Sequence, residues 1–178
     1  MADTCATVFG HEAVRDLHLR YFDPTMSAAE GHEDKGLIEC LMVKTAKALV
    51  YTAGKGASYG KDAEAAMALS LGKPVIFLCD EETHKGFYRD VHPLSRLIEF
   101  DSGVAVGAIV TTDPTQVSEL LRRVFCNEME YRLDHNPEHK RSYFRVKEAL
   151  TDSVIRLQTN DKLIRETFWN YYSCTKSR

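Results

Sequence analysis

Glu64 is the residue whose type and setting point most directly to chemistry. It lies in a segment that runs from an apolar stretch, residues 48–51, through a glycine-rich stretch, residues 53–60, into an alanine-rich pattern. This order predicts a buried strand, a loop and a helix. At the carboxyl end of a parallel strand such a loop forms a ligand crevice, and the helix N-terminus offers free N–H groups to an anion.

The neighbours of Glu64 on the expected helix are apolar, so we expect its carboxylate in the first helical turn, at the mouth of the crevice. Carboxylates with a shifted pKa in clefts tend to be functional. Asp62 has a simpler explanation, because an acid in a first turn stabilises a helix by about 0.3–1 kcal/mol. We predict that Glu64 is catalytic and that the substrate contacts Tyr51, Gly54, Gly56, Ser58, Tyr59, Gly60, Lys61 and Asp62.

Two common nucleotide-binding motifs fail on spacing in this segment. Gly54, Gly56 and Gly60 read G-x-G-x-x-x-G, one residue longer than the dinucleotide fingerprint. Gly60-Lys61-Asp62 lacks the Ser or Thr that follows Lys in a P-loop. A standard NAD dehydrogenase and a P-loop NTPase are therefore both disfavoured.

The segment resembles two known groups of proteins. Gly60-Lys61-Asp62-Ala63-Glu64 followed by Leu71-Gly72-Lys73-Pro74-Val75 resembles the G-T-x-x-E and L-G-K-P-V signature of nucleoside 2-deoxyribosyltransferases. Ser58 with Glu64 six positions later is similar to Toll/interleukin-receptor (TIR) domains, whose NAD-cleaving members use that glutamate. The resemblance covers about residues 17–79 and implies a flavodoxin-like fold with N-glycosidic chemistry. Lys61 stands where the transferases carry Thr, and Gly60 where many TIR domains carry Trp.

The chemistry that the resemblance implies makes physical sense for a carboxylate. Cleavage of a ribosyl C1′–N bond passes through an oxocarbenium-like transition state, which Glu64 would stabilise or trap covalently. Nicotinamide leaves NAD from a cationic nitrogen without an acid, whereas a departing purine is helped by protonation. The sequence presents one well-placed carboxylate, which favours NAD or a related nucleotide. Asp23 is the best candidate for a second acid or for an acceptor of ribose hydroxyls.

Two other functions stay open. A nucleotide-sensing domain of the SLOG type has a similar glycine loop and helix-borne glutamate, and it binds nucleotides without turnover. A TIR-like protein-interaction module would use the loop only as a surface. Turnover of NAD or nucleosides would favour the enzyme, and nucleotide binding without turnover would favour the sensing domain. The absence of both would favour the interaction module.

The elements expected around this segment form a parallel sheet. Short apolar runs predict strands at residues 6–9, 17–22, 48–51, 74–79 and 104–111, with the strand at 48–51 central in the sheet. Helical patterns cover residues 35–46 and 63–71, the first with a buried stripe that includes Leu37 and Leu41, the second ended by Gly72. We therefore predict an α/β, flavodoxin-like (Rossmannoid) core over residues 1–113, with helices on both faces of the sheet.

After Pro114 we expect no further strands. Helical patterns at residues 117–133, 139–157 and 161–172 predict a helical C-terminal region over residues 114–178. This region has a surplus of apolar side chains, which predicts self-association into a homo-oligomer. These side chains are Leu120, Leu121, Phe125, Phe168, Trp169 and Tyr172.

Composition narrows the function classes. The 178 residues are 44% hydrophobic and 28% charged, and 23 basic against 26 acidic side chains give a net charge of −3, so neither nucleic acid nor a membrane is an expected partner. Five cysteines without a C-x-x-C pair or a His at ligand spacing predict reduced thiols and no metal site. The first residues lack a secretion signal, so we expect a cytoplasmic protein that binds a small nucleotide or nucleoside and needs no separate cofactor.

Overall fold

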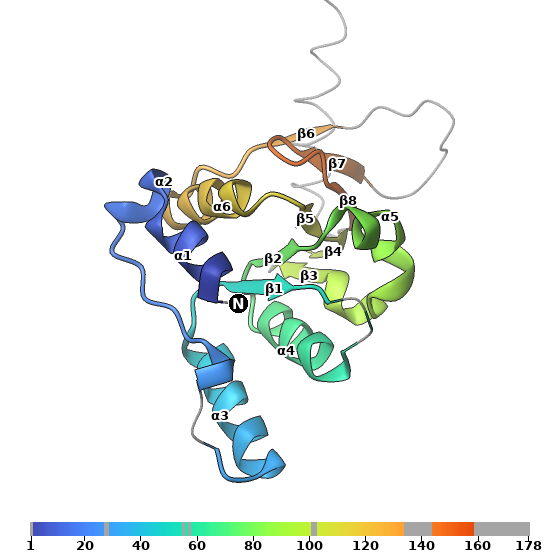
Figure 1. Ribbon diagram of the computed structural model, residues 1–178. Helices are drawn as coiled ribbons and strands as arrows, with labels where there is room; N and C mark the ends of the chain where they lie inside the picture. The colour runs from blue at the N-terminus through green and yellow to red at the C-terminus, as the bar shows by residue number, and fades with distance from the viewer. Residues whose placement is uncertain are drawn as a thin grey trace, which may run out of the picture.

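The computed structural model describes residues 2–26, 29–54, 56, 58–100, 103–133 and 144–158, and they form two sheets with helices around them (Figure 1). The helices are α1 (Ala2–Gly10), α2 (Glu12–Arg15), α3 (His32–Thr45), α4 (Tyr59–Ser70), α5 (Glu81–Asp90) and α6 (Pro114–Cys126), with 3-10 turns η1 (Pro24–Met26) and η2 (Pro93–Arg96). The strands are β1 (Leu49–Thr52), β2 (Val75–Leu78), β3 (Leu97–Phe100), β4 (Gly103–Gly107), β5 (Ile109–Thr111), β6 (Tyr131–Leu133), β7 (Phe144–Glu148) and β8 (Val154–Gln158).

The first sheet is parallel and has the order β1-β2-β5. In its register Tyr51 of β1 lies opposite Phe77 of β2, and Phe77 lies opposite Val110 of β5. Every residue of β2 is buried, as expected for a parallel strand covered on both faces. The strands expected at residues 48–51 and 74–79 are confirmed, but the expected central place of the first is wrong, because β1 is at the edge and β2 is in the middle.

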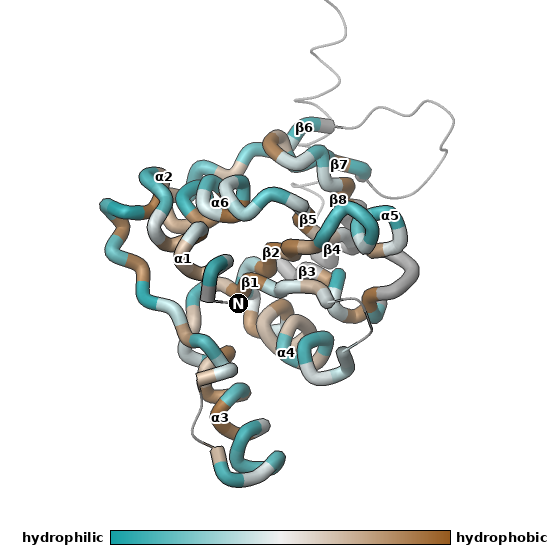
Figure 2. The backbone as a smooth tube through the Cα atoms, viewed as in Figure 1, coloured by the Kyte–Doolittle hydropathy of each residue, from teal (hydrophilic) through white to brown (hydrophobic). Residues whose placement is uncertain are grey.

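Alternate residues of β2 point into two separate cores. Ile76 and Leu78 pack in one core with residues of α1, α2 and α6. Val75 and Phe77 pack in the other with residues of α3, α4 and α5. This is an α/β fold with helices on both faces of a parallel sheet, and its fully buried strand β2 has the brown, hydrophobic colour in Figure 2.

The two strands expected before residue 23 are absent. Residues 6–9 belong to helix α1, where Val8 is buried and its carbonyl accepts a hydrogen bond from Ser118 Oγ of α6 at 2.8 Å. Residues 19–23 are neither helix nor strand and pair with no strand. Tyr21 instead stacks on Phe9, with ring centroids 4.4 Å apart. The alternation in residues 17–22 therefore reflects contacts with α1 and not a place in the sheet.

A second, antiparallel sheet of order β3-β4-β8-β7-β6 corrects the prediction that strands cease after Pro114. Residues 144–157 of the expected helix at 139–157 lie in or between β7 and β8, and the helix expected at 117–133 ends at Cys126, where Asn127 takes a left-handed φ of 58°. The helix expected at 161–172 lies outside the described residues. Because β8 pairs with β4, hydrogen bonds cross the boundary expected at residue 113.

The run at residues 104–111 is two strands and not one, because the chain leaves the second sheet at Gly107 and enters the first at Ile109. Ser153, just before β8, closes the outer edge of the parallel sheet. Its hydroxyl accepts from Val110 N–H at 2.9 Å and donates to Val110 C=O at 3.3 Å. The β5 edge is thus capped by a side chain, while the β1 edge has no strand beside it among the described residues.

Gly107 is expected to be intolerant of a side chain because β8 crosses it closely. A Cβ at this position would lie 2.7 Å from the Val154 carbonyl oxygen and 2.9 Å from Ile155 Cα. We expect Gly107→Ala to lower the free energy of unfolding by about 1–3 kcal/mol, the usual cost of overpacking. Gly36→Ala, where a Cβ in helix α3 meets no atom within 4 Å, is the control and should raise stability by roughly 0.5–1 kcal/mol. Urea denaturation of both variants measures this, and equal stabilities would contradict it.

Candidate functional site

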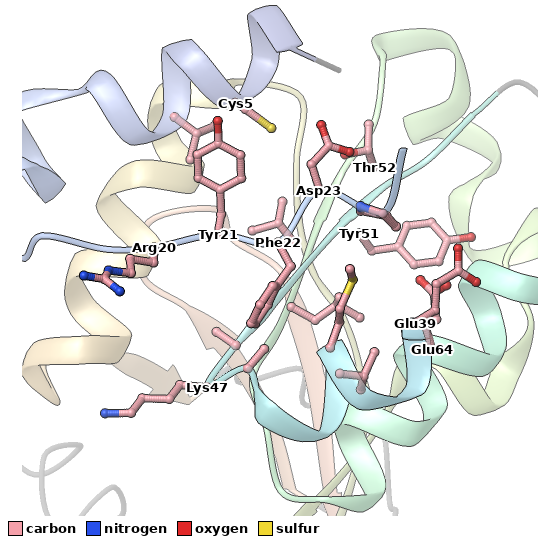
Figure 3. A pocket seen from close by; sticks show the side chains of 18 of the residues that line it. Cys5, Arg20, Tyr21, Phe22, Asp23, Glu39, Lys47, Tyr51, Thr52 and Glu64 are labelled. Atoms are coloured by element: carbon pink, nitrogen blue, oxygen red, sulfur yellow. The ribbon is translucent and has the colours of Figure 1, made fainter. Parts of the chain in front are cut away.

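A cavity of about 800 Å³ lies along the open edge of β1 (Figure 3). All four residues of β1 line it, together with parts of α1, α3, α6, the start of α4 and the segment at residues 18–25. Its walls therefore come from segments that are far apart in the sequence. No helix in the described part of the chain is long and apolar enough to cross a membrane.

Two glutamates from different helices face each other in this cavity. Glu64 of α4 and Glu39 of α3 both line it, and their carboxyl groups lie near each other (Figure 3). Burial raises the pKa of the Glu64 carboxyl, and the negative charge of Glu39 and the hydrogen bond with it raise that pKa further. Lys61 and Lys35 oppose the shift, and Lys35 Nζ lies 3.6 Å from Glu39 Oε1. Glu64 is therefore a half-buried carboxyl group that holds its proton more tightly than an exposed one.

Glu39 reaches the cavity because the face of α3 that lines it carries both charged and apolar side chains. Lys35, Glu39, Met42 and Val43 line the cavity at helical spacing, whereas Leu37 is 62% exposed and Leu41 53%. The expected stripe through Leu37 and Leu41 is therefore not the buried face of the helix. The predicted helix itself is confirmed, with bounds at His32 and Thr45.

Lys73 holds the C-terminal end of α3. Its ammonium donates to the carbonyl of Val43 at 2.7 Å and also to those of Lys44 and Ala46. Carbonyls in the last turn of a helix have no partner within the helix, and a positive charge there is favourable. The lysine of the L-G-K-P-V stretch thus fixes the helix that carries Glu39.

Helix α4 begins one turn earlier than the alanine-rich pattern indicates. Ser58 is its N-cap, with Oγ 3.5 Å from the Lys61 N–H, so Gly60 lies in the helix and not in the loop. Glu64 consequently lies in the second turn of α4, whereas the sequence analysis expected it in the first turn. At the other end Gly72 has a φ of +68°, which confirms it as the helix stop. Lys61 Nζ donates to Thr52 C=O at 2.8 Å and joins α4 to the end of β1.

Asp62 has a structural role that the sequence did not predict. It is 7% exposed, and its Oδ1 accepts a hydrogen bond from the Tyr51 hydroxyl at 2.8 Å. The backbone N–H of His92 lies 3.4 Å from Oδ2, and Ser95 Oγ donates to the Asp62 carbonyl. Burial and the Asp62 carboxylate raise the pKa of Tyr51. Asp62 does lie in the first turn of α4, as expected, but it is also a buried acceptor that links α4 to β1 and η2, which a first-turn acid alone does not explain.

Asp23 lines the same cavity but is set apart from the two glutamates (Figure 3). Its Oδ1 accepts from the Thr25 hydroxyl at 2.6 Å and from the Thr25 N–H at 2.9 Å. These bonds lower the pKa of Asp23. An anion at neutral pH can accept hydrogen bonds from hydroxyl groups but cannot donate a proton, which leaves the second of the two roles considered for it.

The structure brings together six of the ten predicted site residues. Those that line the cavity are Asp23, Tyr51, Ser58, Gly60, Lys61 and Glu64. Those that do not are Gly54, Gly56, Tyr59 and Asp62. The sequence analysis did not predict Glu39 as a site residue. The signal that could have found it is the i, i+4 pair of Lys35 and Glu39, which places two charged side chains on one face of α3.

No protein-family model, no curated protein and no solved structure matches this chain. The site therefore has to be interpreted from its own geometry. Among the described residues, no three His, Cys, Asp or Glu side chains are arranged to hold a metal ion. The polar side chains that line this cavity include the carboxyl groups of Asp23, Glu39 and Glu64, the ammonium groups of three lysines and the phenols of Tyr21 and Tyr51.

The Glu64 pKa makes a prediction about stability. Because its folded-state pKa lies above the ordinary carboxyl value of about 4.3, the folded chain binds more protons than the unfolded chain between these two values. The free energy of unfolding therefore falls as pH rises through this interval. Glu64→Gln carries no such penalty, and its amide can still donate to Glu39.

We expect Glu64→Gln to melt at a higher temperature than the parent at about pH 8 and to lose this advantage at about pH 4. Thermal unfolding followed by circular dichroism at both pH values measures the difference. Glu33→Gln, an exposed substitution on α3, is the matched control and should show no such dependence. A Glu64→Gln effect that is the same at both pH values would contradict the raised pKa.

Proposed function

We propose that this protein cleaves the N-glycosidic bond of NAD or of a related nucleotide or nucleoside, as a hydrolase or a transferase, with Glu64 as the carboxylate that acts at C1′. The observation that carries the proposal is the half-buried Glu64 carboxyl in a cavity of about 800 Å³, large enough for a nucleoside or nucleotide. Its raised pKa and its position in a cleft are typical of functional carboxylates. The resemblance of residues 60–64 and 71–75 to nucleoside 2-deoxyribosyltransferases, and of Ser58 with Glu64 to TIR domains, supports the same chemistry.

Glu64 would act on the sugar. As the bond from C1′ to the base breaks, positive charge develops at C1′, and a carboxylate beside it stabilises that charge more in the transition state than in the bound substrate. Water is scarce beside a half-buried group, so the electrostatic effect is larger than at an exposed one. The ionised form is required, and Lys61 favours it, because that ammonium lowers the Glu64 pKa.

The other residues of the cavity have complementary roles in the proposal. The Asp23 anion would accept hydrogen bonds from ribose hydroxyls, since its low pKa keeps it charged. Ser58, Gly60 and Lys61 would contact a phosphate at the start of α4, where the helix dipole favours an anion. Gly60 has open space where a Cβ would stand, so a ligand can approach its backbone.

The proposal also covers the architecture, the location, the partner and the oligomeric state of the protein. We propose a flavodoxin-like architecture and a cytoplasmic location, with a small nucleotide or nucleoside as the partner. The homo-oligomer stays a prediction, but its original reason is weaker. Leu120 and Leu121 are buried in the chain's own core, Phe125 is partly exposed, and the three remaining aromatic residues lie outside the described part of the chain.

The proposed reaction is tested with Glu64→Gln. The substitution keeps the shape of the side chain and removes its negative charge. We expect kcat with NAD or a deoxynucleoside to fall by about 10²–10³-fold while KM changes little, because the charge acts mainly in the transition state. Chromatographic separation of the released base from the substrate measures turnover.

Glu33→Gln is the control for this experiment and should keep full turnover. Asp62→Asn is unsuitable, because Asp62 is buried and hydrogen-bonded to Tyr51. A thermal shift with nucleotide but no product would favour the nucleotide-sensing module. The absence of both a product and a thermal shift with every nucleotide tested would favour the interaction module.

A further inference from the structure

We propose that the end of the cavity remote from Glu64 is a second binding subsite, in which Tyr21 takes the flat face of a base while Arg20 and Lys47 bind a phosphate of the same ligand. The ligand unit with this chemistry is a nucleotide. The subsite makes the substrate a dinucleotide and not a nucleoside, a consequence that rests on the proposed N-glycosidic activity of Glu64. Binding of a nucleotide at the subsite does not depend on that activity.

The cavity has two chemically different ends. Figure 3 shows the carboxyl groups of Glu39 and Glu64 on one side. The opposite side carries an aromatic ring and two cations, which belong to Tyr21, Arg20 and Lys47. Both cationic side chains extend away from the two glutamates. At about 800 Å³ the cavity is near the upper end of the range for small-molecule sites, so a ligand that contacts Glu64 has room to reach the opposite side.

Tyr21 offers one free face of its ring. The other face stacks on Phe9 of α1, with the ring centroids 4.4 Å apart and the two planes 11° from parallel. Tyr21 is nevertheless 51% exposed and lines the cavity, so the face that Phe9 leaves uncovered is open to a ligand. Bases stack on aromatic side chains through their π faces, and a ring that is already held in place loses little freedom when a base binds.

Arg20 and Lys47 have no acidic partner in the described part of the chain. Neither side chain forms an ion pair or a hydrogen bond with another described residue, whereas Lys35 of the same cavity lies 3.6 Å from Glu39 Oε1. Two such cations on one side of a cavity favour an anion. The fork of a guanidinium group matches the oxygens of a phosphate, and an ammonium group adds a second positive charge.

The chain that carries the subsite is held by contacts along its length. Leu19, next to Arg20, packs against the core that β2 shares with α1, α2 and α6. Beyond Tyr21, the Asp23 carboxylate accepts from the Thr25 N–H at 2.9 Å. Asp23 lies between the two ends of the cavity in Figure 3, where it can accept hydrogen bonds from a ribose. A ligand that stacks on Tyr21 and reaches the glutamates therefore passes a group that binds its sugar.

Binding of simple nucleotides tests the subsite directly. Adenosine, AMP and adenosine 2′,5′-bisphosphate share one base and differ in their phosphates, and isothermal titration calorimetry on the full chain with Glu64→Gln, which excludes turnover, compares them. We expect a phosphorylated ligand to bind more tightly than adenosine, and high salt to reduce this difference. Tightest binding of the bisphosphate would assign the bound phosphate to the ribose of the second nucleotide, and equal binding of AMP would assign it to the link between the two nucleotides.

Variants of the three residues separate the contributions of the ring and the charges. Tyr21→Leu should weaken AMP binding by about 5–150-fold, the loss expected for one stacked base, and Tyr21→Phe should bind like the parent. Arg20→Gln and Lys47→Gln should each weaken the binding of phosphorylated ligands by about two- to fivefold and leave adenosine unaffected. Tyr59→Leu and Lys44→Gln are the matched controls, because both residues are exposed and neither lines the cavity. Circular dichroism checks that each variant is folded.

Turnover distinguishes a failure of the subsite from a failure of the proposed function. Nicotinamide riboside has the same scissile bond as NAD but lacks the second nucleotide, so Glu64→Gln should impair both reactions, whereas Tyr21→Leu should raise KM for NAD alone. If Tyr21→Leu binds AMP like the parent, or if neither phosphorylated ligand binds more tightly than adenosine, the subsite is wrong and the proposed function stands. If nucleotides bind as expected but NAD, NADP and nicotinamide riboside are all left intact, the proposed function fails and the subsite stands.

Discussion

The hydrogen bonds of β1 are the constraint on which the site depends. This strand is paired to β2 along its whole length, and on its other side no strand lies among the described residues. The side chains and backbone along that side line the cavity, and α3, α4 and the segment at residues 18–25 surround it. The opposite edge of the same sheet, at β5, is occupied by the Ser153 hydroxyl. Within the described part of the chain, the open edge of β1 is therefore the side of this sheet that faces the cavity.

Carboxylates away from solvent need donors, and this protein meets that need in two ways. Asp62 accepts from Tyr51, and the fully buried Glu148 accepts from the Leu150 N–H and from the N–H and hydroxyl of Thr151, so both are stabilised as parts of the fold. Glu64 has a second carboxyl as its partner, an arrangement that costs stability at neutral pH. A fold that retains such a cost at the wall of a cavity is typical of a functional site.

Lys61 and Lys73, from the segments that resemble known families, donate hydrogen bonds to backbone carbonyl groups. Lys61 donates to the carbonyl at the end of β1, and Lys73 donates to the carbonyls at the end of α3. Each joins an element that carries a site residue to its neighbour. The resemblance in residues 60–75 therefore includes positions that hold α3, α4 and β1 in place, as well as the glutamate itself.

The sequence by itself determined the elements formed by local patterns: α3, α4 and its stop at Gly72, β1, β2, and the place of Glu64 beside a strand end. It also contained the alternation of Phe144–Glu148, which a helical interpretation overlooked. Only the tertiary structure decided which strand is central, that residues 104–111 divide between two sheets, and that residues 19–23 stay unpaired, because strand pairing joins segments distant in the chain. It alone brought Glu39 to Glu64, since the face that α3 turns inward is set by its packing beside α4 and β1 and not by its own apolar periodicity.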